Sequence, residues 1–251
     1  MSRYRTLGVA AAAVLAHGAP GLTAVASLRR NLSGVVPRLA GRGRGGHLAL
    51  TFDDGPDSAS TPSFLKELDA LGWHATFFML GSLAAVAPGL VEEVAAAGHE
   101  IAVHGYHHVN HLARTPRAVA DDVRRARDTL GGLTGVSPRW LRPPYGVLSG
   151  ATVGAARRER LGLVLWSAWG RDWTDTASAE SVAAQVESDL AKLSGPSGPT
   201  VLLHDSDCTS APGSWRSGAG SLRILAQRWA GRYDVGTVSE HFGVHGPAPR
   251  V

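Results

Sequence analysis

The sequence predicts an α/β fold, in which helices cover a parallel sheet. From His47 onward, short apolar runs alternate with longer segments of helical periodicity, which is typical of strands joined by helices. The chain has 251 residues, enough to bury a full core in one such domain. Polar residues suited to catalysis follow five of the apolar runs, where α/β proteins place their sites. A closed barrel and an open doubly wound sheet both fit these observations.

Seven apolar runs are short enough to be buried strands. They cover residues 48–52, 75–79, 99–103, 138–142, 162–167, 200–204 and 233–237. Six helices are expected between them, over residues 61–71, 87–98, 115–134, 150–160, 178–193 and 218–231. Boundary signals support these limits, since Thr115 can cap a helix that begins at Pro116 and Gly98 stands where a helix should end.

Charge is distributed unevenly along the chain. Residues 1–46 contain seven of the 25 Lys and Arg residues and no Asp or Glu. The remaining residues, 47–251, therefore carry 18 basic side chains against 21 acidic ones. A nucleic-acid-binding domain should carry its own basic patch, so we expect no nucleic-acid partner. The single cysteine, Cys208, allows no internal disulfide.

Residues 1–46 are interpreted as a leader and linker, and residues 47–251 as the catalytic domain. Two arginines precede an apolar run over residues 7–16, and a small-residue segment at 24–26 could be a cleavage site. This pattern favours export or membrane association. The alternatives are an Ala-rich helix packed beside the domain and a cytoplasmic protein. Residues 42–46, rich in Arg and Gly, are expected to be a linker.

The segment 51–56, Thr-Phe-Asp-Asp-Gly-Pro, places two carboxylates where the first strand ends. Neighbouring side chains of a strand point to opposite faces, but the chain leaves the pleat at Gly55 and Pro56. Asp53 and Asp54 can therefore reach one site and still act differently, one as a metal ligand and the other as a base. The alternative is a turn without a site, because the residues at 53–56, Asp-Asp-Gly-Pro, are all common in turns.

A histidine-rich segment follows the third predicted strand. His104 and His108 stand at positions i and i+4, which face the same way in a helical turn and suit one metal ion. With Asp54 they would form a His-His-Asp site that leaves room for water. The pair His107 and His111 has the same spacing and is the rival set. The alternative is a cluster of exposed loop histidines.

Three further segments follow later strands. Arg142 precedes two prolines and Tyr145, so a fixed cation and the Tyr145 amide can be preorganised on a stiff loop. Residues 165–173 are rich in tryptophan and include Asp172, which could orient a histidine. His204 ends the sixth predicted strand and precedes a long loop of small residues, a type of loop that is often functional.

Five ordered motifs resemble those of the polysaccharide deacetylases, carbohydrate esterase family four, also called the NodB-homology domain. They are Thr51-Phe52-Asp53-Asp54, His104-x-x-x-His108, Arg142-x-Pro144-Tyr145, Asp172-Trp173 and Leu202-Leu203-His204. The resemblance covers residues 47–240 and implies a distorted barrel of seven or eight β/α units. It also implies a hydrolase that removes N-acetyl groups from an amino sugar of a peptidoglycan- or chitin-type carbohydrate.

The resemblance further implies roles for individual residues. Asp53 would be the general base, and Asp54, His104 and His108 would bind a divalent metal ion, usually Zn²⁺. The backbone amide of Tyr145 would donate to the oxyanion.

The remaining implied roles concern the acid and the acyl pocket. Arg142 would hold the base, and Asp172 would orient His204, the general acid. Trp173 and Leu202 would line the acetyl pocket.

Two positions depart from the family pattern. Gly105 stands where the family usually has Ser or Thr, so a hydroxyl that braces the metal loop is missing. Its loss should loosen the ligands more than abolish binding. Trp169 stands where many relatives carry an acidic residue, which bears on substrate preference.

Other functions remain open at this point. The same site could hydrolyse a different amide or ester, or the domain could bind sugar without turnover. A two-histidine, one-carboxylate site also suits a non-haem iron oxygenase. The sequence identifies neither the polymer nor the oligomeric state.

Overall fold

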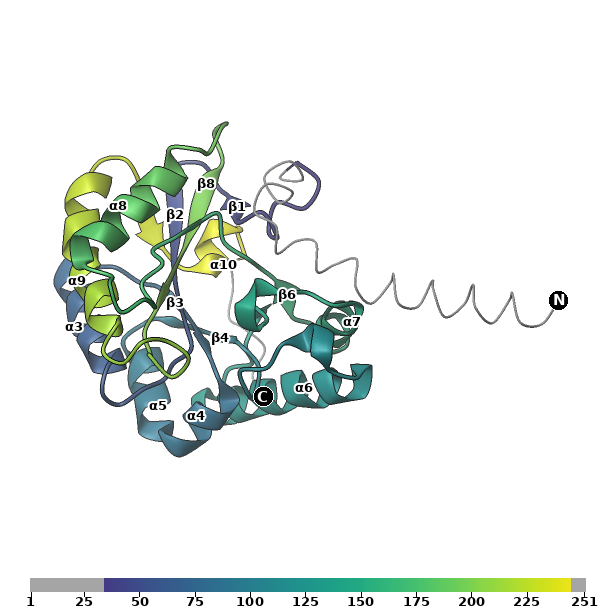
Figure 1. Ribbon diagram of the computed structural model, residues 1–251. Coiled ribbons are helices and arrows are strands. Elements are labelled where there is room, and N and C mark those ends of the chain that lie inside the picture. The colour runs from purple at the N-terminus through teal and green to yellow at the C-terminus, as the bar shows by residue number, and fades with distance from the viewer. Residues whose placement is uncertain (1–33, 245–251) are drawn as a thin grey trace.

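The computed structural model describes residues 34–244, which form one sheet with helices around it (Figure 1). Nine strands within these residues make up the sheet, in the order β1-β8-β2-β3-β4-β5-β6, with β7 paired to β8 and β9 to β2. The strands are β1 (Arg42–Gly43), β2 (His47–Asp53), β3 (Thr76–Met79), β4 (Glu100–Val103), β5 (Trp140–Leu141), β6 (Gly162–Leu163), β7 (Ala168–Trp169), β8 (Gly198–His204) and β9 (Asp234–Gly236).

Strand β2 lies at the centre of the sheet. All seven of its residues are buried, as expected for a strand covered on both faces. One edge pairs with β8, in a register that places Asp53 opposite His204. The other edge pairs with β9 near the start of β2 and with β3 near its end. These pairings are parallel, whereas β1 runs antiparallel to β8.

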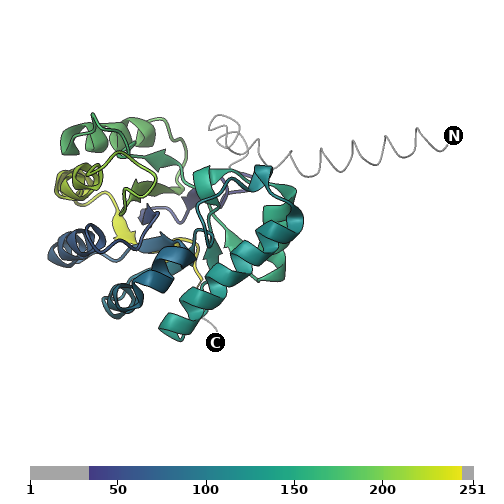
Figure 2. The same cartoon turned by 60° about the horizontal axis from the view of Figure 1, so that its bottom comes forward.

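The sheet curls into a distorted barrel, with the helices on its outer side (Figure 2). Within the described residues β6 pairs with β5 alone, so strand pairing leaves the barrel open beyond β6. There the N–H of Leu165 donates to the carbonyl of Arg38 at 3.1 Å, and the segment before β1 lies against the opening. The α/β class and the distorted barrel that the resemblance implies are confirmed.

Helices connect the strands and cover the outer face of the sheet. They are α3 (Thr61–Leu71), α4 (Gly81–Val86), α5 (Pro88–Ala96), α6 (Pro116–Thr134), α7 (Gly150–Arg158), α8 (Ala179–Leu190), α9 (Trp215–Trp229) and α10 (Val238–His241), with short 3₁₀ turns at His111–Ala113 and Pro144–Gly146. The main core lies between these helices and the sheet and includes Phe52, Phe64, Phe77 and Trp229, all almost fully buried. Each such side chain contributes on the order of 1.5–3 kcal/mol by leaving water.

The expected helix boundaries agree closely with the structure. Helix α3 spans the predicted residues, and the Thr115 hydroxyl accepts from the N–H of Ala118 at the start of α6. At the end of α6, Gly135 adopts a left-handed conformation (φ 68°) that glycine tolerates without steric cost.

Three features differ from the sequence-based expectation. Of the strand predicted over 162–167 only Gly162–Leu163 is a strand, β6, and β7 begins after it at Ala168; within residues 164–167 the N–H groups of Leu165 and Ser167 donate to other segments, to the carbonyls of Arg38 and Thr200. Helices α4 and α10 were not predicted, being too short to show a helical period. Residues 42–46, expected to be a linker, contain β1, and Arg42 is buried there and donates to the carbonyl of Ser194 at 2.8 Å.

Residues 1–33 lie outside the described residues, and so does the predicted export or membrane segment. That segment and the boundary between leader and domain stay predictions. Among the helices that the structure describes, none has the length and apolar character needed to span a membrane.

Candidate active site

The predicted site residues lie together at the carboxyl-terminal edge of the sheet. Asp53 ends β2 opposite His204 at the end of β8, while His104 directly follows β4 and Arg142 directly follows β5. Because the ends of parallel strands meet at one edge, these side chains converge although they are far apart in sequence. Asp53, His104 and His204 line a cavity of 360 Å³. The lining residues are Asp53, Asp54, His104, His108, Tyr145, Gly146, Trp166, Trp169, Trp173, Leu202, His204, Thr209 and Ser210.

Asp54, His104 and His108 form a cluster that could hold one metal ion. Asp54 Oδ1 lies 3.2 Å from Nε2 of His104 and 3.3 Å from Nε2 of His108. One ligand atom from each residue lies within 4.8 Å of the other two, and no other such cluster occurs in residues 34–244. Two imidazoles and a carboxylate are a donor set that suits Zn²⁺ and similar divalent ions.

The polar atoms of this cluster fit a bound cation. Asp54 Oδ1 is buried and accepts no hydrogen bond. A buried polar atom without a partner is costly, and a cation between Oδ1 and the two ring nitrogens would satisfy it. Burial alone would raise the pKa of Asp54, but the adjacent His104 ring holds that pKa well below its usual range. Asp54 is therefore ionised and ready to bind a cation.

The rival histidine pair does not converge on this cluster. Nδ1 of His111 lies 3.0 Å from the hydroxyl of Thr152, so this buried ring is turned toward α7. The exposed ring of His107 packs against Tyr106, with 4.9 Å between ring centroids. The structure thus places His104 and His108 beside Asp54, while His111 faces Thr152 and His107 packs on Tyr106.

Asp53 is held apart from the metal cluster by a buried cation. Nη1 of Arg142 donates to Asp53 Oδ1 at 2.7 Å and to the Thr51 hydroxyl at 2.9 Å. The Arg142 guanidinium is fully buried and lies over the Phe78 ring, 4.0 Å from its centroid. Asp53 Oδ2 remains 3.8 Å from Nδ1 of His104, outside hydrogen-bond reach. The adjacent carboxylates of Asp53 and Asp54 thus have different partners.

His204 lines the cavity and is paired with Asp172. Asp172 Oδ1 lies 2.9 Å from Nδ1 of His204, and its Oδ2 accepts the backbone N–H of His204 at 2.8 Å. This double contact fixes the ring and directs the Nδ1 proton to Asp172. Burial alone would lower the pKa of His204, but the Asp172 carboxylate raises it to about 9. His204 is therefore a charged proton donor at neutral pH.

An aromatic wall, made of Trp166, Trp169 and Trp173, closes one side of the cavity. Trp169 lies between the other two, with ring centroids 5.8 Å from Trp166 and 4.7 Å from Trp173. Leu202 of β8 is buried against the same cluster. The wall offers flat apolar faces, of the kind that sugar rings stack on.

Tyr145 also lines the cavity and has a strained backbone. It adopts φ 61° within the short turn Pro144–Gly146, a conformation that is uncommon for residues other than glycine. Its ring packs edge-on against His108, with centroids 4.5 Å apart. The strain is consistent with a turn that serves a site rather than the fold.

The sequence did not reveal two residues that support the cluster, Asp122 and Thr209. The Asp122 carboxylate of α6 accepts the N–H of Tyr106 at 2.7 Å and of His107 at 3.2 Å, which braces the loop that carries the metal-cluster histidines. Gly105 in that loop has φ 109°, and a Cβ there would lie 3.0 Å from Asp122. The available signal for Asp122 was a carboxylate on the otherwise apolar, buried face of α6.

The fold and the site define a class: a curled α/β barrel whose edge carries a possible metal site, a separate carboxylate and a histidine paired with an aspartate. Comparison with known proteins gives the family. The sequence model "Polysaccharide deacetylase" matches residues 40–164. The chain belongs to the polysaccharide deacetylase family.

Two similar sequences have curated names. The chain is 36% identical over 165 residues to a peptidoglycan-N-acetylglucosamine deacetylase of Bacillus cereus, an alignment covering 63% of this chain and 72% of that one. It is 36% identical over 157 residues to a chitooligosaccharide deacetylase of Bradyrhizobium sp., covering 62% and 69%. Other relatives are longer: the matched region spans 50% of another B. cereus peptidoglycan-N-acetylglucosamine deacetylase and 33% of PgdA from Listeria monocytogenes.

Solved structures show the same fold. The Bc1960 peptidoglycan N-acetylglucosamine deacetylase superimposes with a TM-score of 0.72 at 27% identity, covering 81% of this chain and 92% of that one. A family 4 carbohydrate esterase from Streptomyces lividans, solved with acetate, gives 0.66 at 28% identity, covering 82% and 97%.

Proposed function

We propose that this protein is a metal-dependent hydrolase that removes N-acetyl groups from amino sugars of peptidoglycan- or chitin-type carbohydrates. The observation that carries the proposal is that three groups at the cavity have three different sets of partners. One carboxylate, Asp54, faces two imidazoles, while its neighbour Asp53 is bound to Arg142. A third, separate group is the charged His204. The names of the curated relatives and their sequence identity support the same reaction.

The residues fit a divalent cation, which we propose to be Zn²⁺. Asp54, His104 and His108 would hold it. When bound, such an ion lowers the pKa of a bound water to about 7 and polarises the carbonyl of the substrate. Three protein ligands leave a position for that water.

Asp53 is suited to act as the general base. Arg142 holds its Oδ1, so the carboxylate has a fixed orientation and its Oδ2 remains free to accept the proton of the attacking water. The oxygen of the water bonds to the acetyl carbonyl carbon, and negative charge develops on the carbonyl oxygen. The backbone N–H of Tyr145, in its rigid turn, would donate to that oxygen.

His204 is suited to complete the reaction as the general acid. Because Asp172 occupies Nδ1, the proton available to the substrate is the one on Nε2. As the carbon–nitrogen bond breaks, this proton passes to the leaving nitrogen, and acetate and the free amine are formed. Trp173 and Leu202 would surround the acetyl methyl group, with the sugar ring beside the aromatic wall.

The direct test is acetate release from N-acetylated chitin oligomers and from peptidoglycan fragments. The chain is assayed as purified, after chelator treatment, and after zinc is restored. We expect activity that disappears with chelator and returns with zinc, and the better substrate identifies the polymer class. Zinc binding without acetate release from either substrate would contradict the proposal. Acetate release from an aryl acetate alone would then identify an esterase, and iron-dependent oxidation an oxygenase.

A further inference from the structure

The loop after β8, residues 205–214, lines the cavity through Thr209 and Ser210 and is bonded to two segments that carry site residues. At its start, the N–H of Asp205 donates to the carbonyl of Asp53 at 3.3 Å. Farther on, the N–H of Ala211 donates to the carbonyl of Trp173 at 2.9 Å. The loop is thus fastened at both ends to segments that carry site residues. Thr209 lies between these two anchors.

Thr209 contacts the metal cluster directly. Its hydroxyl donates to Asp54 Oδ2 at 2.5 Å, a short distance typical of a hydroxyl bound to a charged carboxylate. The other oxygen, Oδ1, has no hydrogen bond and lies 3.2 and 3.3 Å from the Nε2 atoms of His104 and His108. The two oxygens of one carboxylate therefore have different surroundings.

Asp54 needs such support because its backbone is strained. It has φ 78°, a left-handed conformation that costs on the order of 1–3 kcal/mol for a residue other than glycine. The thiol of Cys208 lies 3.6 Å from the Asp54 carbonyl oxygen, so the loop holds the main chain as well as the side chain. Side chain and backbone of Asp54 are thus both positioned by the 205–214 loop.

We propose that Thr209 is a positioning residue that makes Asp54 a one-oxygen ligand of the metal ion. With Oδ2 engaged by the hydroxyl, only Oδ1 is presented to a cation. A carboxylate that binds through both oxygens would occupy the position that a water molecule needs in a catalytic site. The proposal rests on the metal site of the proposed function and extends it to a loop that lies outside the five sequence motifs.

The test measures zinc affinity by competition with a chromogenic chelator for the wild-type chain, Thr209→Val, Thr209→Ser and Ser210→Ala. Valine keeps the shape of threonine without its hydroxyl, and Thr209 is exposed, so the variant should fold. We expect Thr209→Val to weaken zinc binding by about 10–100-fold, as for loss of a group that orients a ligand. Thr209→Ser should keep wild-type affinity because it keeps the hydroxyl. Ser210→Ala removes a neighbouring hydroxyl that has no bond to Asp54 and should also keep it.

A second readout is the visible absorption of the Co²⁺-substituted protein, which reports coordination number. If Asp54 gains a second metal contact in Thr209→Val, the absorption should weaken, and it should recover in Thr209→Ser. A wild-type chain that binds zinc and releases acetate, with Thr209→Val equal to it in affinity and spectrum, would overturn the role of Thr209 alone. A wild-type chain that binds no zinc would overturn the proposed function, and this inference with it.

Discussion

The two edges of the sheet both contain buried histidines, but the surroundings of these histidines differ. At the carboxyl-terminal edge, His104 and His204 lie against carboxylates, which raise the pKa of both rings against the opposing effect of burial. At the amino-terminal edge, burial lowers the pKa of His99 to about 4 and of His241 to about 3. For these four rings the direction of the pKa shift follows the presence or absence of an adjacent carboxylate.

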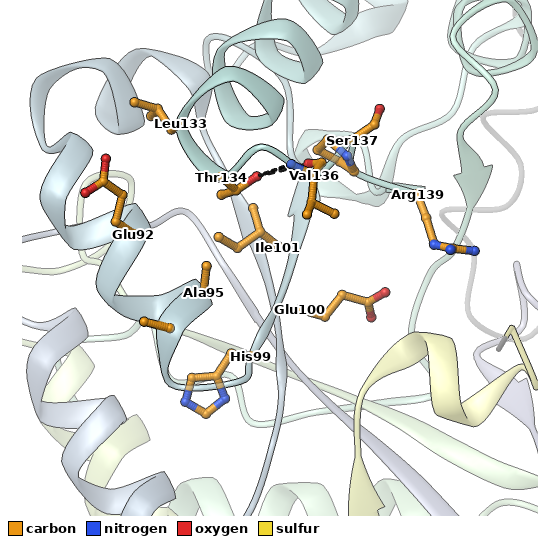
Figure 3. Close-up of a pocket in the computed structure, with 12 residues that line it drawn as sticks. Glu92, Ala95, His99, Glu100, Ile101, Leu133, Thr134, Val136, Ser137 and Arg139 are labelled. Atoms are coloured by element: carbon orange, nitrogen blue, oxygen red, sulfur yellow. Dashed lines mark hydrogen bonds between the residues drawn. The ribbon is translucent and has the colours of Figure 1, made fainter. Parts of the chain in front are cut away.

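The two edges also each have a cavity, and the larger one is not the candidate site. A cavity of 490 Å³ opens beside the start of β4, between α5 and the end of α6 (Figure 3). Glu100 in its wall already accepts from Trp140 Nε1 at 3.0 Å and from the Thr76 hydroxyl at 2.7 Å. None of its lining residues, all of which the structure describes, has a buried side-chain polar atom without a hydrogen bond. The smaller cavity has several, so unsatisfied atoms mark the site better than volume does.

The special role of the carboxyl-terminal edge is tested most directly at Asp53, where we expect the largest effect. Asp53→Asn removes the base and keeps the shape of the side chain. We expect kcat/KM to fall by about 10²–10⁴-fold, because a positioned base contributes that much. Zinc content should stay at one ion per chain, since Asp54 and the two histidines are unchanged. The matched control is Asp57→Asn, a nearby carboxylate outside the cavity, which should keep its activity. An active Asp53→Asn variant that retains zinc would remove Asp53 as the base.

The pairing of His204 with Asp172 gives the second prediction, a shift with pH. In Asp172→Asn the carboxylate that raises the His204 pKa to about 9 is gone, so the pKa should fall toward its usual range. The alkaline limb of the pH–rate profile should then move to lower pH, because the general acid loses its proton earlier. Asp175→Asn, an exposed carboxylate nearby, is the control and should leave the profile in place.

In the chain freed of metal by chelator, the free energy of unfolding should also depend on the pair of His204 and Asp172. The folded-state pKa of His204 is raised, so its contribution is fully present below the unfolded pKa of about 6.5. It is lost as pH rises through about 9. Urea unfolding should therefore show wild type and Asp172→Asn furthest apart near pH 6 and closer together near pH 10. A difference that is constant across this range would show that the pair acts through packing, not charge.

Features that depend on a local pattern of side chains can be predicted from the sequence, whereas features that depend on contacts between distant segments cannot. Strands β2 and β8 are seven-residue buried runs and can be read from side-chain pattern alone. Two-residue strands such as β1 and β7 cannot, because only their hydrogen bonds to neighbouring strands define them. The sequence likewise shows strand-end residues such as Asp53 and His204. It does not show Thr209, which lies 155 positions after Asp54 and meets it only through the path of a loop.

The smallest effect is expected at the amino-terminal edge, at His99. This buried ring accepts the N–H of Ala75 at 3.3 Å through Nδ1, and glutamine can supply an acceptor oxygen in its place. Its folded-state pKa is lowered to about 4. The contribution of neutral His99 to stability is therefore fully present above about pH 6.5 and is lost as pH falls toward 4. His99→Gln should therefore resist acid unfolding better than wild type and match it near pH 7.5. Zinc affinity and kcat should not change, because His99 lies at the edge of the sheet opposite the metal cluster. If His99→Gln altered zinc affinity while leaving acid unfolding unchanged, the contrast between the two edges would not hold, since a histidine without a carboxylate partner would then be contributing to the site.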